Sequence, residues 1–475
     1  MKKRLIAFIL TLIMLFTLPY SASAISQNNK KELIRYIYFS ALTNAKNEVD
    51  SVELFLDTLM KFAGENDEDY EQVLKYLTQS IDEYGDYISP EESEDVDAEL
   101  TGSSGGIGAT VELRNGKIYV VNVLPGSPSE KMGVQVGHAI VKADGVDLSG
   151  MSLNEALTYI RGEVGTEVVI TFANPYDRQY DIIIVRDVIE IASVAYSTFT
   201  DYPQIGYIDI SNFSLTTGEE VKEALTDLQS QNVDKIILDL RYNGGGVLSG
   251  AIDVAGLFLE EGQEILTVEP RDETQKETYY ASGHMYDGEV IILVNEHTAS
   301  ASEIVTAALK DHDRATVFGE RTYGKGTVQN LFPLPYYGGY FKYTIAEYLT
   351  PNGTIIDKVG ITPNLTVNNK GYHLTEEEIP EFEFLRVMRI GDTGEDVKNI
   401  KGSLKKLNYQ LDDTNIYDLD TFNAVKSFQQ KEELYPYGVC DFTTQQHLKQ
   451  ALLNTVFYED TQLETALEEF TRSDN

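Results

Sequence analysis

A serine and a lysine in this sequence each stand in a local setting that suits nucleophilic chemistry. Ser300 follows the apolar run 290–294, which predicts a buried strand, and precedes a helical pattern, so its hydroxyl is expected at a helix N-terminus. The unpaired N–H groups and the helix dipole there favour the negative charge that develops when a serine attacks a carbonyl. Lys325 lies between Gly324 and Gly326, and glycines on both sides place a lysine on a loop.

A third segment leads from a predicted strand into a glycine loop. Residues 235–240, Lys-Ile-Ile-Leu-Asp-Leu, predict another strand, and Gly244, Gly245 and Gly246 follow it closely. Glycine lets a backbone N–H group approach a reacting carbonyl, as an oxyanion hole requires. A serine at a helix start is usually only a cap, and a lysine in a glycine-rich loop is usually solvated. The three segments together favour catalysis.

These segments resemble the motifs of the C-terminal processing peptidases, the tail-specific serine proteases. They read Asp-Leu-Arg-Tyr-Asn-Gly-Gly-Gly at 239–246, Thr-Ala-Ser-Ala-Ser-Glu-Ile at 298–304 and Gly-Lys-Gly-Thr-Val-Gln at 324–329. Two positions depart from the family pattern, because Thr298 replaces a serine and Gly244 replaces a proline. The second change makes the glycine loop less rigid, since glycine loses more entropy on folding than proline does.

The resemblance implies a role for each matching residue. Ser300 is the nucleophile, Lys325 is its general base, and Gln329 orients the lysine. The backbone N–H groups of Gly246 and Ala301 form the oxyanion hole. Neither a metal nor a cofactor is implied.

A Ser-His-Asp site is the competing chemistry, since the chain has six histidines. His297 precedes Ser300 by three positions, too close along a loop to face it without a special turn, and no Gly-x-Ser-x-Gly elbow surrounds the serine. The sequence therefore favours the Ser/Lys pair. That pair requires burial to lower the pKa of Lys325 from its reference value of about 10.4.

The N-terminus predicts export. Residues 1–24 combine a basic start, an apolar stretch from 5 to 18 and small residues at 22–24, as a secretory signal peptide does. We expect an extracytoplasmic protein, secreted or associated with the cell envelope, and anchored in the membrane if the signal is not cleaved. Cys440 is the only cysteine, so no intramolecular disulfide can form. The formal net charge of −38 opposes binding to nucleic acid.

Short alternating strands and one helix in residues 101–187 resemble a PDZ domain of the protease-associated kind. Such domains bind a peptide as an added strand and hold its terminal carboxylate on successive backbone N–H groups. Gly106, Ile107 and Gly108 match that carboxylate-binding loop, and Ile107 and Leu157 are expected to line an adjoining apolar pocket. The expected partner is a protein or peptide with a free C-terminus.

Two apolar helical faces, 397–407 and 421–428, predict a C-terminal three-helix domain that resembles peptidoglycan-binding domains. Peptidoglycan is therefore an expected partner, and a helical domain that packs on the protease without touching sugar is the alternative. Residues 454–475 read as a mobile acidic tail. The helical pattern after the signal offers a surface for a homodimer.

The predicted fold is an α/β protease core, a mixed sheet with flanking helices, that carries an inserted PDZ-like β-rich domain, an N-terminal helical region and a C-terminal three-helix domain. The expected boundaries are signal peptide 1–24, N-terminal helical region 25–100, PDZ domain 101–187, peptidase core 188–376, linker 377–385, peptidoglycan-binding-like domain 386–453 and acidic tail 454–475.

We predict an exported serine endopeptidase that recognises protein C-termini through the PDZ domain and cleaves through an acyl-enzyme on Ser300, with Lys325 as base. The alternative from another class is a catalytically silent scaffold that tethers protein tails to the cell wall. A scaffold has no need of the joined serine, lysine, glutamine and glycine motifs. Hydrolysis of a small ester or amide leaves the PDZ-like segment unexplained.

Overall fold

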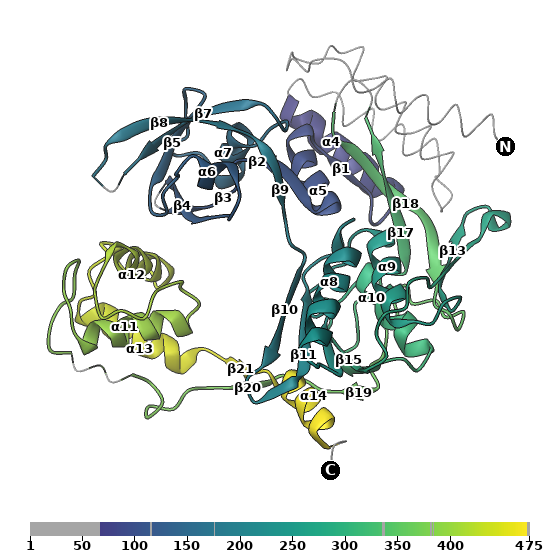
Figure 1. Ribbon diagram of the computed structural model, residues 1–475. Coiled ribbons are helices and arrows are strands. Elements are labelled where there is room, and N and C mark those ends of the chain that lie inside the picture. The colour runs from purple at the N-terminus through teal and green to yellow at the C-terminus, as the bar shows by residue number, and fades with distance from the viewer. Residues whose placement is uncertain are drawn as a thin grey trace. The chain divides into compact units, whose positions relative to one another are not determined.

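The computed structural model in Figure 1 describes residues 67–114, 116–174, 176–334, 338–380, 382 and 384–472. The predicted signal peptide, the first part of the predicted N-terminal helical region and the proposed dimer surface there lie outside the described residues. None of the described helices combines the length and the apolar composition that crossing a bilayer requires.

A mixed six-stranded sheet forms the centre of the predicted α/β core. Its strand order is β10-β11-β12-β15-β16-β19, with β10 and β11 antiparallel and the other neighbours parallel. The apolar strands β12 and β15 are almost wholly buried, as parallel strands covered on both faces are. The strand bounds are β10 Val194–Phe199, β11 Tyr202–Ile210, β12 Lys235–Asp239, β15 Glu289–Val294, β16 Thr316–Gly319 and β19 Leu365–Thr366.

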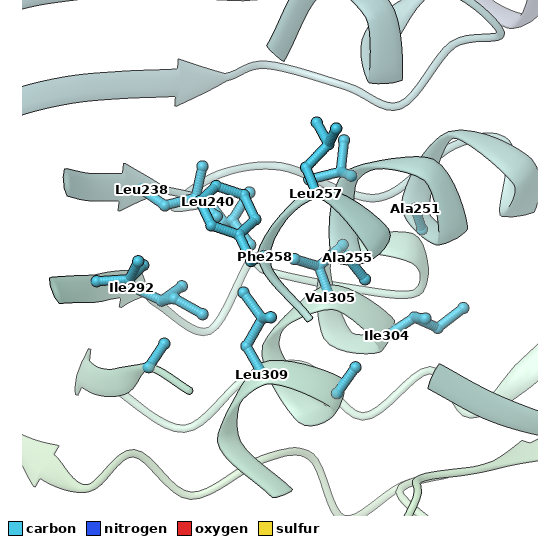
Figure 2. Packing of buried hydrophobic residues seen from close by; sticks show 14 of the residues in the cluster. Leu238, Leu240, Ala251, Ala255, Leu257, Phe258, Ile292, Ile304, Val305 and Leu309 are labelled. Carbon is cyan, nitrogen blue, oxygen red and sulfur yellow. The ribbon is translucent and has the colours of Figure 1, made fainter. Parts of the chain in front are cut away.

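Three helices, α8 (Thr217–Ser230), α9 (Leu248–Phe258) and α10 (Ala301–Asp311), flank this sheet. Figure 2 shows their apolar side chains meeting those of the strands, with Phe258 of α9 near Leu240 and Leu309 of α10 near Ile292. The predicted mixed sheet with flanking helices is therefore confirmed. The large apolar core fixes the ends of β12 and β15, after which the glycine loop and the serine motif follow.

A second, antiparallel sheet carries the lysine motif. Its order is β1-β18-β13-β14, with β17 also paired to β18, and β1 pairs with β18 so that Asp86 lies opposite Lys342. The N-terminal helices α4 and α5 flank β1 along the chain. The bounds are α4 Asp67–Ile81, β1 Asp86–Ile88, α5 Pro90–Thr101, β13 Glu264–Pro270, β14 Glu277–Tyr280, β17 Thr327–Pro333 and β18 Tyr340–Leu349. The segment after α4 is thereby held beside β18, which also pairs with β17, the strand that begins two residues after Lys325.

Residues 105–189 form a separate antiparallel domain with its own apolar core, inserted between α5 and β10. Strands β2 and β9 pair at its two ends. The elements are β2 Ser103–Gly106, β3 Ala109–Arg114, β4 Lys117–Val123, α6 Pro128–Lys131, β5 Ala139–Ala143, β6 Val146–Asp147, α7 Leu153–Ile160, β7 Glu167–Ala173, β8 Gln179–Val185 and β9 Asp187–Glu190. Small strands with two short helices agree with the predicted PDZ-like insertion.

The C-terminal domain contains the three expected helices, α11 (Glu395–Lys406), α12 (Leu419–Lys431) and α13 (Phe442–Asn454), around a core that includes the buried Cys440. Ile379 of the predicted linker is buried together with Leu452 of α13.

The last residues differ from the expected mobile tail, because they form a strand and a helix. Strand β21 (Phe457–Glu459) pairs with β20 (Lys370–Tyr372), and α14 (Thr461–Arg472) follows. The acidic composition suggested solvation, but Ala466 and Phe470 are buried on one face of α14. Four-residue spacing of two apolar side chains gives this helix a packing face.

Candidate active site

Ser300 stands at the turn between β15 and α10, as the sequence predicted. Its backbone has φ 55° and ψ −115°, a conformation that a residue with a Cβ atom rarely adopts. Such a conformation costs free energy and persists where the surrounding structure enforces it. The residue is half-exposed, although the strand before it and the helix after it are buried. The turn therefore presents the serine at the surface of a rigid core.

The serine turn is hydrogen-bonded to the glycine loop that follows β12. The carbonyl oxygen of Asn243 accepts from the N–H of Ala299 and from the hydroxyl of Ser302, at 3.0 Å each. The buried hydroxyl of Thr298 donates to the carbonyl oxygen of Leu240 at 2.8 Å. Thr298, which replaces the serine of the family pattern, therefore supplies a structural hydroxyl.

The glycine loop approaches the serine turn more closely than a side chain would allow. A Cβ atom added at Gly245 would lie 2.8 Å from Cβ of Ser300, and one added at Gly246 would lie 2.0 Å from the carbonyl oxygen of Phe213. The backbone N–H groups of Gly246 and Ala301 donate no hydrogen bond to any residue that the structure describes. Both donors are thus left for a ligand beside the serine.

Glycines also shape the lysine loop between β16 and β17. A Cβ atom at Gly324 would lie 2.7 Å from the backbone N of Gly360, and one at Gly326 would lie 2.5 Å from the backbone N of Asp357. Both glycines therefore pack closely against the segment after β18. The backbone of Lys325, which lies between these two glycines, is held in place by their contacts.

The carboxylate of Glu303 joins the serine turn to the lysine loop. Its Oε2 accepts the backbone N–H of Ser300 at 2.9 Å and that of Lys325 at 2.8 Å. Its Oε1 accepts the N–H of Gly324 at 2.8 Å and the hydroxyl of Thr322 at 2.5 Å. Complete burial raises the pKa of Glu303, and these hydrogen bonds, which favour the carboxylate, oppose that rise.

Tyr348 joins the same two segments through their carbonyl groups. Its hydroxyl donates to the carbonyl oxygen of Lys325 at 2.9 Å and, more weakly, to that of Ser300 at 3.2 Å. Burial raises the pKa of this phenol well above its ordinary value, with Glu303 and Asp357 adding to the effect, so the hydroxyl keeps its proton. The peptide groups around both motif residues are therefore held from the N–H side and from the C=O side.

The side chain of Lys325 points to an aromatic ring from the N-terminal segment. Its Nζ lies 5.5 Å from the centroid of the Tyr84 ring, a distance typical of a cation–π contact. Within the part of the chain that the structure describes, no hydrogen bond joins this amino group to the hydroxyl of Ser300. Catalytic hydrogen bonds often form only when substrate is bound.

Burial lowers the pKa of Lys325, and the positive charge of Lys342 lowers it further. Asp82 and Glu303 act in the opposite direction, since a negative charge favours the ammonium form. The net effect is a pKa of Lys325 below its ordinary value. The neutral amine, the form that a general base requires, is therefore easier to reach than for a lysine in water.

Gln329 lies on β17, but its amide serves other groups. Its Nε2 donates to the hydroxyl of Thr327 at 2.7 Å and to that of Thr344 at 3.3 Å. The N–H of Thr344 donates in turn to Asp82 at 2.7 Å. Among the residues that the structure describes, no hydrogen bond joins Gln329 to Lys325. The contact by which Gln329 was expected to orient the lysine is therefore not formed in this structure.

The competing histidine has a different environment. His297 is exposed, and its ring stacks on Tyr242 with the ring centroids 5.5 Å apart. Among the described residues, no histidine forms a hydrogen bond with Ser300.

The predicted carboxylate-binding loop lies at the start of the inserted domain. The N–H groups of Ile107 and Gly108 donate no hydrogen bond within the described chain, and Gly108 has φ 74°, with no room for a Cβ atom beside Ser127. Ile107 itself is only 3% exposed and belongs to the domain core, whereas Leu157 is half-buried. The backbone of this loop is open to a ligand, but the side chain of Ile107 is not.

Three residues near the site received no role from the sequence, namely Glu303, Tyr348 and Tyr84. Glu303 stands three positions after Ser300, the N3 position from which an acid can reach back to the backbone N–H of the residue before the helix. That spacing signals a contact with Ser300 but not the one with Lys325. No local pattern signals Tyr348 or Tyr84, because their contacts join segments distant in sequence.

Comparison with known proteins places these features in a family. Residues 204–367 match the model of peptidase family S41, residues 119–174 match a PDZ domain, and residues 393–448 match a putative peptidoglycan binding domain. The fold and the matched domains define a serine peptidase with an inserted PDZ domain.

Curated relatives extend this similarity along the chain. The carboxy-terminal processing protease CtpA of Bacillus subtilis (strain 168) is 35% identical over 396 residues, covering 83% of this chain and 84% of the relative. A probable CtpA-like serine protease of Staphylococcus aureus (strain MSSA476) is 34% identical over 360 residues, which are 75% and 71% of the two chains. A solved photosystem II D1 C-terminal processing protease is 24% identical, with a TM-score of 0.44, over 72% of this chain and 94% of that one.

The chain therefore belongs to the carboxy-terminal processing serine proteases of peptidase family S41. The sequence-based prediction of a serine protease is confirmed, in preference to the alternative of a catalytically silent scaffold.

Proposed function

We propose that Ser300 and Lys325 form the catalytic dyad of this protease. The hydroxyl oxygen of Ser300 attacks the scissile carbonyl carbon while the neutral amine of Lys325 takes its proton. The oxyanion accepts hydrogen bonds from the N–H groups of Gly246 and Ala301. The lysine then gives its proton to the leaving amine, and water hydrolyses the acyl-enzyme with the lysine again as base.

The observation that carries this proposal is the contact of one Glu303 oxygen with the N–H groups of both Ser300 and Lys325. Two residues whose backbones share one acceptor atom have side chains that start from neighbouring positions. We propose that the side chain of Lys325 turns away from Tyr84, which its Nζ faces at 5.5 Å from the ring centroid, to reach the serine hydroxyl.

Substitution tests the dyad directly. Ser300→Ala and Lys325→Ala should each reduce peptide cleavage to background, because the hydroxyl is inert without a base and the base is useless without the hydroxyl. Lys222→Ala, at an exposed position of α8, is the matched control and should cleave normally. Both inactive variants should keep the thermal unfolding midpoint within a few degrees. Near-normal cleavage by either one would rule out the dyad.

We further propose that the PDZ domain reads the C-terminus of the substrate. The unused N–H groups of Ile107 and Gly108 support this, because successive N–H groups can hold a terminal carboxylate, and Gly106 precedes them at the end of β2. The test compares cleavage of one peptide as free acid, as amide and with a final aspartate, at low substrate concentration. The amide should react about ten- to a hundredfold more slowly, given the strength of charge-assisted hydrogen bonds. Equal rates would rule out carboxylate reading.

The third part of the proposal is an extracytoplasmic enzyme that binds the cell wall. The signal-like N-terminus and the match to a peptidoglycan binding domain support it. Full-length Ser300→Ala protein should sediment with purified sacculi, and serum albumin should not. Failure to sediment would leave the domain with a packing role only.

A further inference from the structure

The C-terminal domain has an open hollow of about 510 Å³ between the end of α11 and the helices α12 and α13. We call it the α12–α13 hollow, and its lining includes Tyr409, Phe428, Lys431, Gln446, His447 and Gln450. The volume falls within the usual range for small-ligand sites. Most of its lining lies in residues 393–448, which match a putative peptidoglycan binding domain, and Gln450 and Asn454 lie just beyond them on α13. The match does not say which surface binds.

Amide side chains form one wall of the hollow. Gln446, Gln450 and Asn454 are exposed and lie four positions apart along α13, so they share one face of the helix. Nε2 of Gln450 donates to Oδ1 of Asn454 at 2.9 Å, and this bond holds the two amides in place. The amide of Gln446 forms no hydrogen bond within the described chain. This wall therefore offers both donors and acceptors to a ligand.

The opposite part of the lining is aromatic. Phe428 is buried at the floor, and Tyr409 is half-buried, with a hydroxyl that forms no hydrogen bond to the residues described here. A tyrosine in that position presents an apolar ring together with a polar tip. A sugar ring has the matching character, because its C–H faces are apolar and its rim carries hydroxyl groups.

The charges of the hollow favour a ligand without a large net charge. Glu432 lies 3.5 Å from His447 across the lining, and Lys431 adds one exposed cation. Residues 386–454 contain nine lysines and arginines against ten acids, although the whole chain carries −38. Neither a polyanion nor a polycation finds a complementary surface here.

We propose that the α12–α13 hollow binds an uncharged, N-acetylated segment of a glycan strand, an inference that rests on the proposed binding to the cell wall. The amides of Gln446 and Gln450 bind the hydroxyl and N-acetyl groups, and the ring of Tyr409 covers a sugar face. The acidic stem peptides of the wall are not the ligand of this hollow.

The test measures sedimentation of the full-length protein with purified sacculi, with Ser300→Ala present in every sample so that nothing is cleaved. The double variant Gln446→Ala/Gln450→Ala should bind about tenfold more weakly or worse, because it loses at least two hydrogen bonds. Tyr409→Phe removes only the hydroxyl and should weaken binding to a smaller degree. Gln430→Ala is the matched control, since Gln430 is exposed on α12 outside the lining. A soluble β-1,4-linked tetramer of N-acetylglucosamine should compete, and a free stem peptide should not.

The outcomes separate the two proposals. If the full-length Ser300→Ala protein with an unchanged C-terminal domain does not sediment with sacculi, both the wall binding and the hollow are overturned. If it sediments and the double variant binds equally well, wall binding stands and the hollow is the wrong surface. Competition by the stem peptide but not by the tetramer would overturn the glycan as ligand. Cys440, buried in the core of the C-terminal domain, should be alkylated as slowly in each variant as in the unchanged protein, which shows that the substituted domain is folded.

Discussion

The carboxylate of Glu303 holds the backbone N–H of Lys325 at 2.8 Å, and with the same oxygen it holds the N–H of Ser300. The position of the proposed base relative to the proposed nucleophile thus depends on a third side chain, which is fully buried. Positioning of this kind affects the rate without any direct contact with substrate.

Replacing Glu303 by glutamine should separate the two motifs. An amide NH₂ group would then face N–H donors, and each unpaired buried donor costs about 1–3 kcal/mol, so the free energy of unfolding should fall by about that amount. Misplacement of the base should lower kcat/KM on the order of a hundredfold. Chemical denaturation and peptide cleavage measure the two effects, with the exposed Glu223→Gln as control. Unchanged cleavage would show that this contact does not position the dyad.

The hydroxyl of Tyr348 should contribute in the same way from the carbonyl side. Tyr348→Phe removes the donor to the carbonyl groups of Ser300 and Lys325 and should cost about 1–3 kcal/mol of unfolding free energy. The loss should appear mainly in kcat, because no substrate contact is changed. Tyr202→Phe, at an exposed tyrosine, provides the comparison. A change confined to KM would contradict this role.

The contact between Tyr84 and Lys325 should appear in the pH profile. Activity should rise with pH through the pKa of the lysine, which burial places below its ordinary value, because only the neutral amine accepts a proton. The Tyr84 ring stabilises the ammonium form, so Tyr84→Leu should move this rise to lower pH. Tyr84→Phe keeps the ring and should leave the profile in place. Identical profiles for Leu and Phe would show that the ring does not hold the charged lysine.

Alanine substitution should have opposite effects at two glycines of the same loop, Gly244 and Gly246. Gly246 has φ 141° and no room for a Cβ atom, so Gly246→Ala should displace the proposed oxyanion donor and cost roughly a hundred- to a thousandfold in kcat. Gly244 has open space around it, and Gly244→Ala should keep activity and add about 0.4–1 kcal/mol of unfolding free energy. Equal activity of both variants would remove Gly246 from the oxyanion hole.

The sequence predicted those parts of the site that local patterns encode. An apolar run followed by a capped helix places Ser300 at a strand–helix turn, and flanking glycines place Lys325 on a loop. The contacts of Glu303, Tyr348 and Tyr84 with Lys325 arise only when two sheets and the segment after α4 come together, so no window of sequence contains them. The mobile tail was predicted from the acidic composition of the last residues, and this prediction was wrong. The four-residue spacing of Ala466 and Phe470, which gives α14 a buried face, was the signal that it missed.

The single thiol gives this protein a built-in reporter of one domain. Cys440 is fully buried among the helices α11, α12 and α13, and burial raises the pKa of its thiol, so a thiol reagent can react only after that domain opens. The rate of alkylation under native conditions therefore measures the opening of the C-terminal domain, while peptide cleavage follows the integrity of the protease core. A ligand that binds the folded C-terminal domain would slow the alkylation, which turns one cysteine into a binding assay that needs no added label.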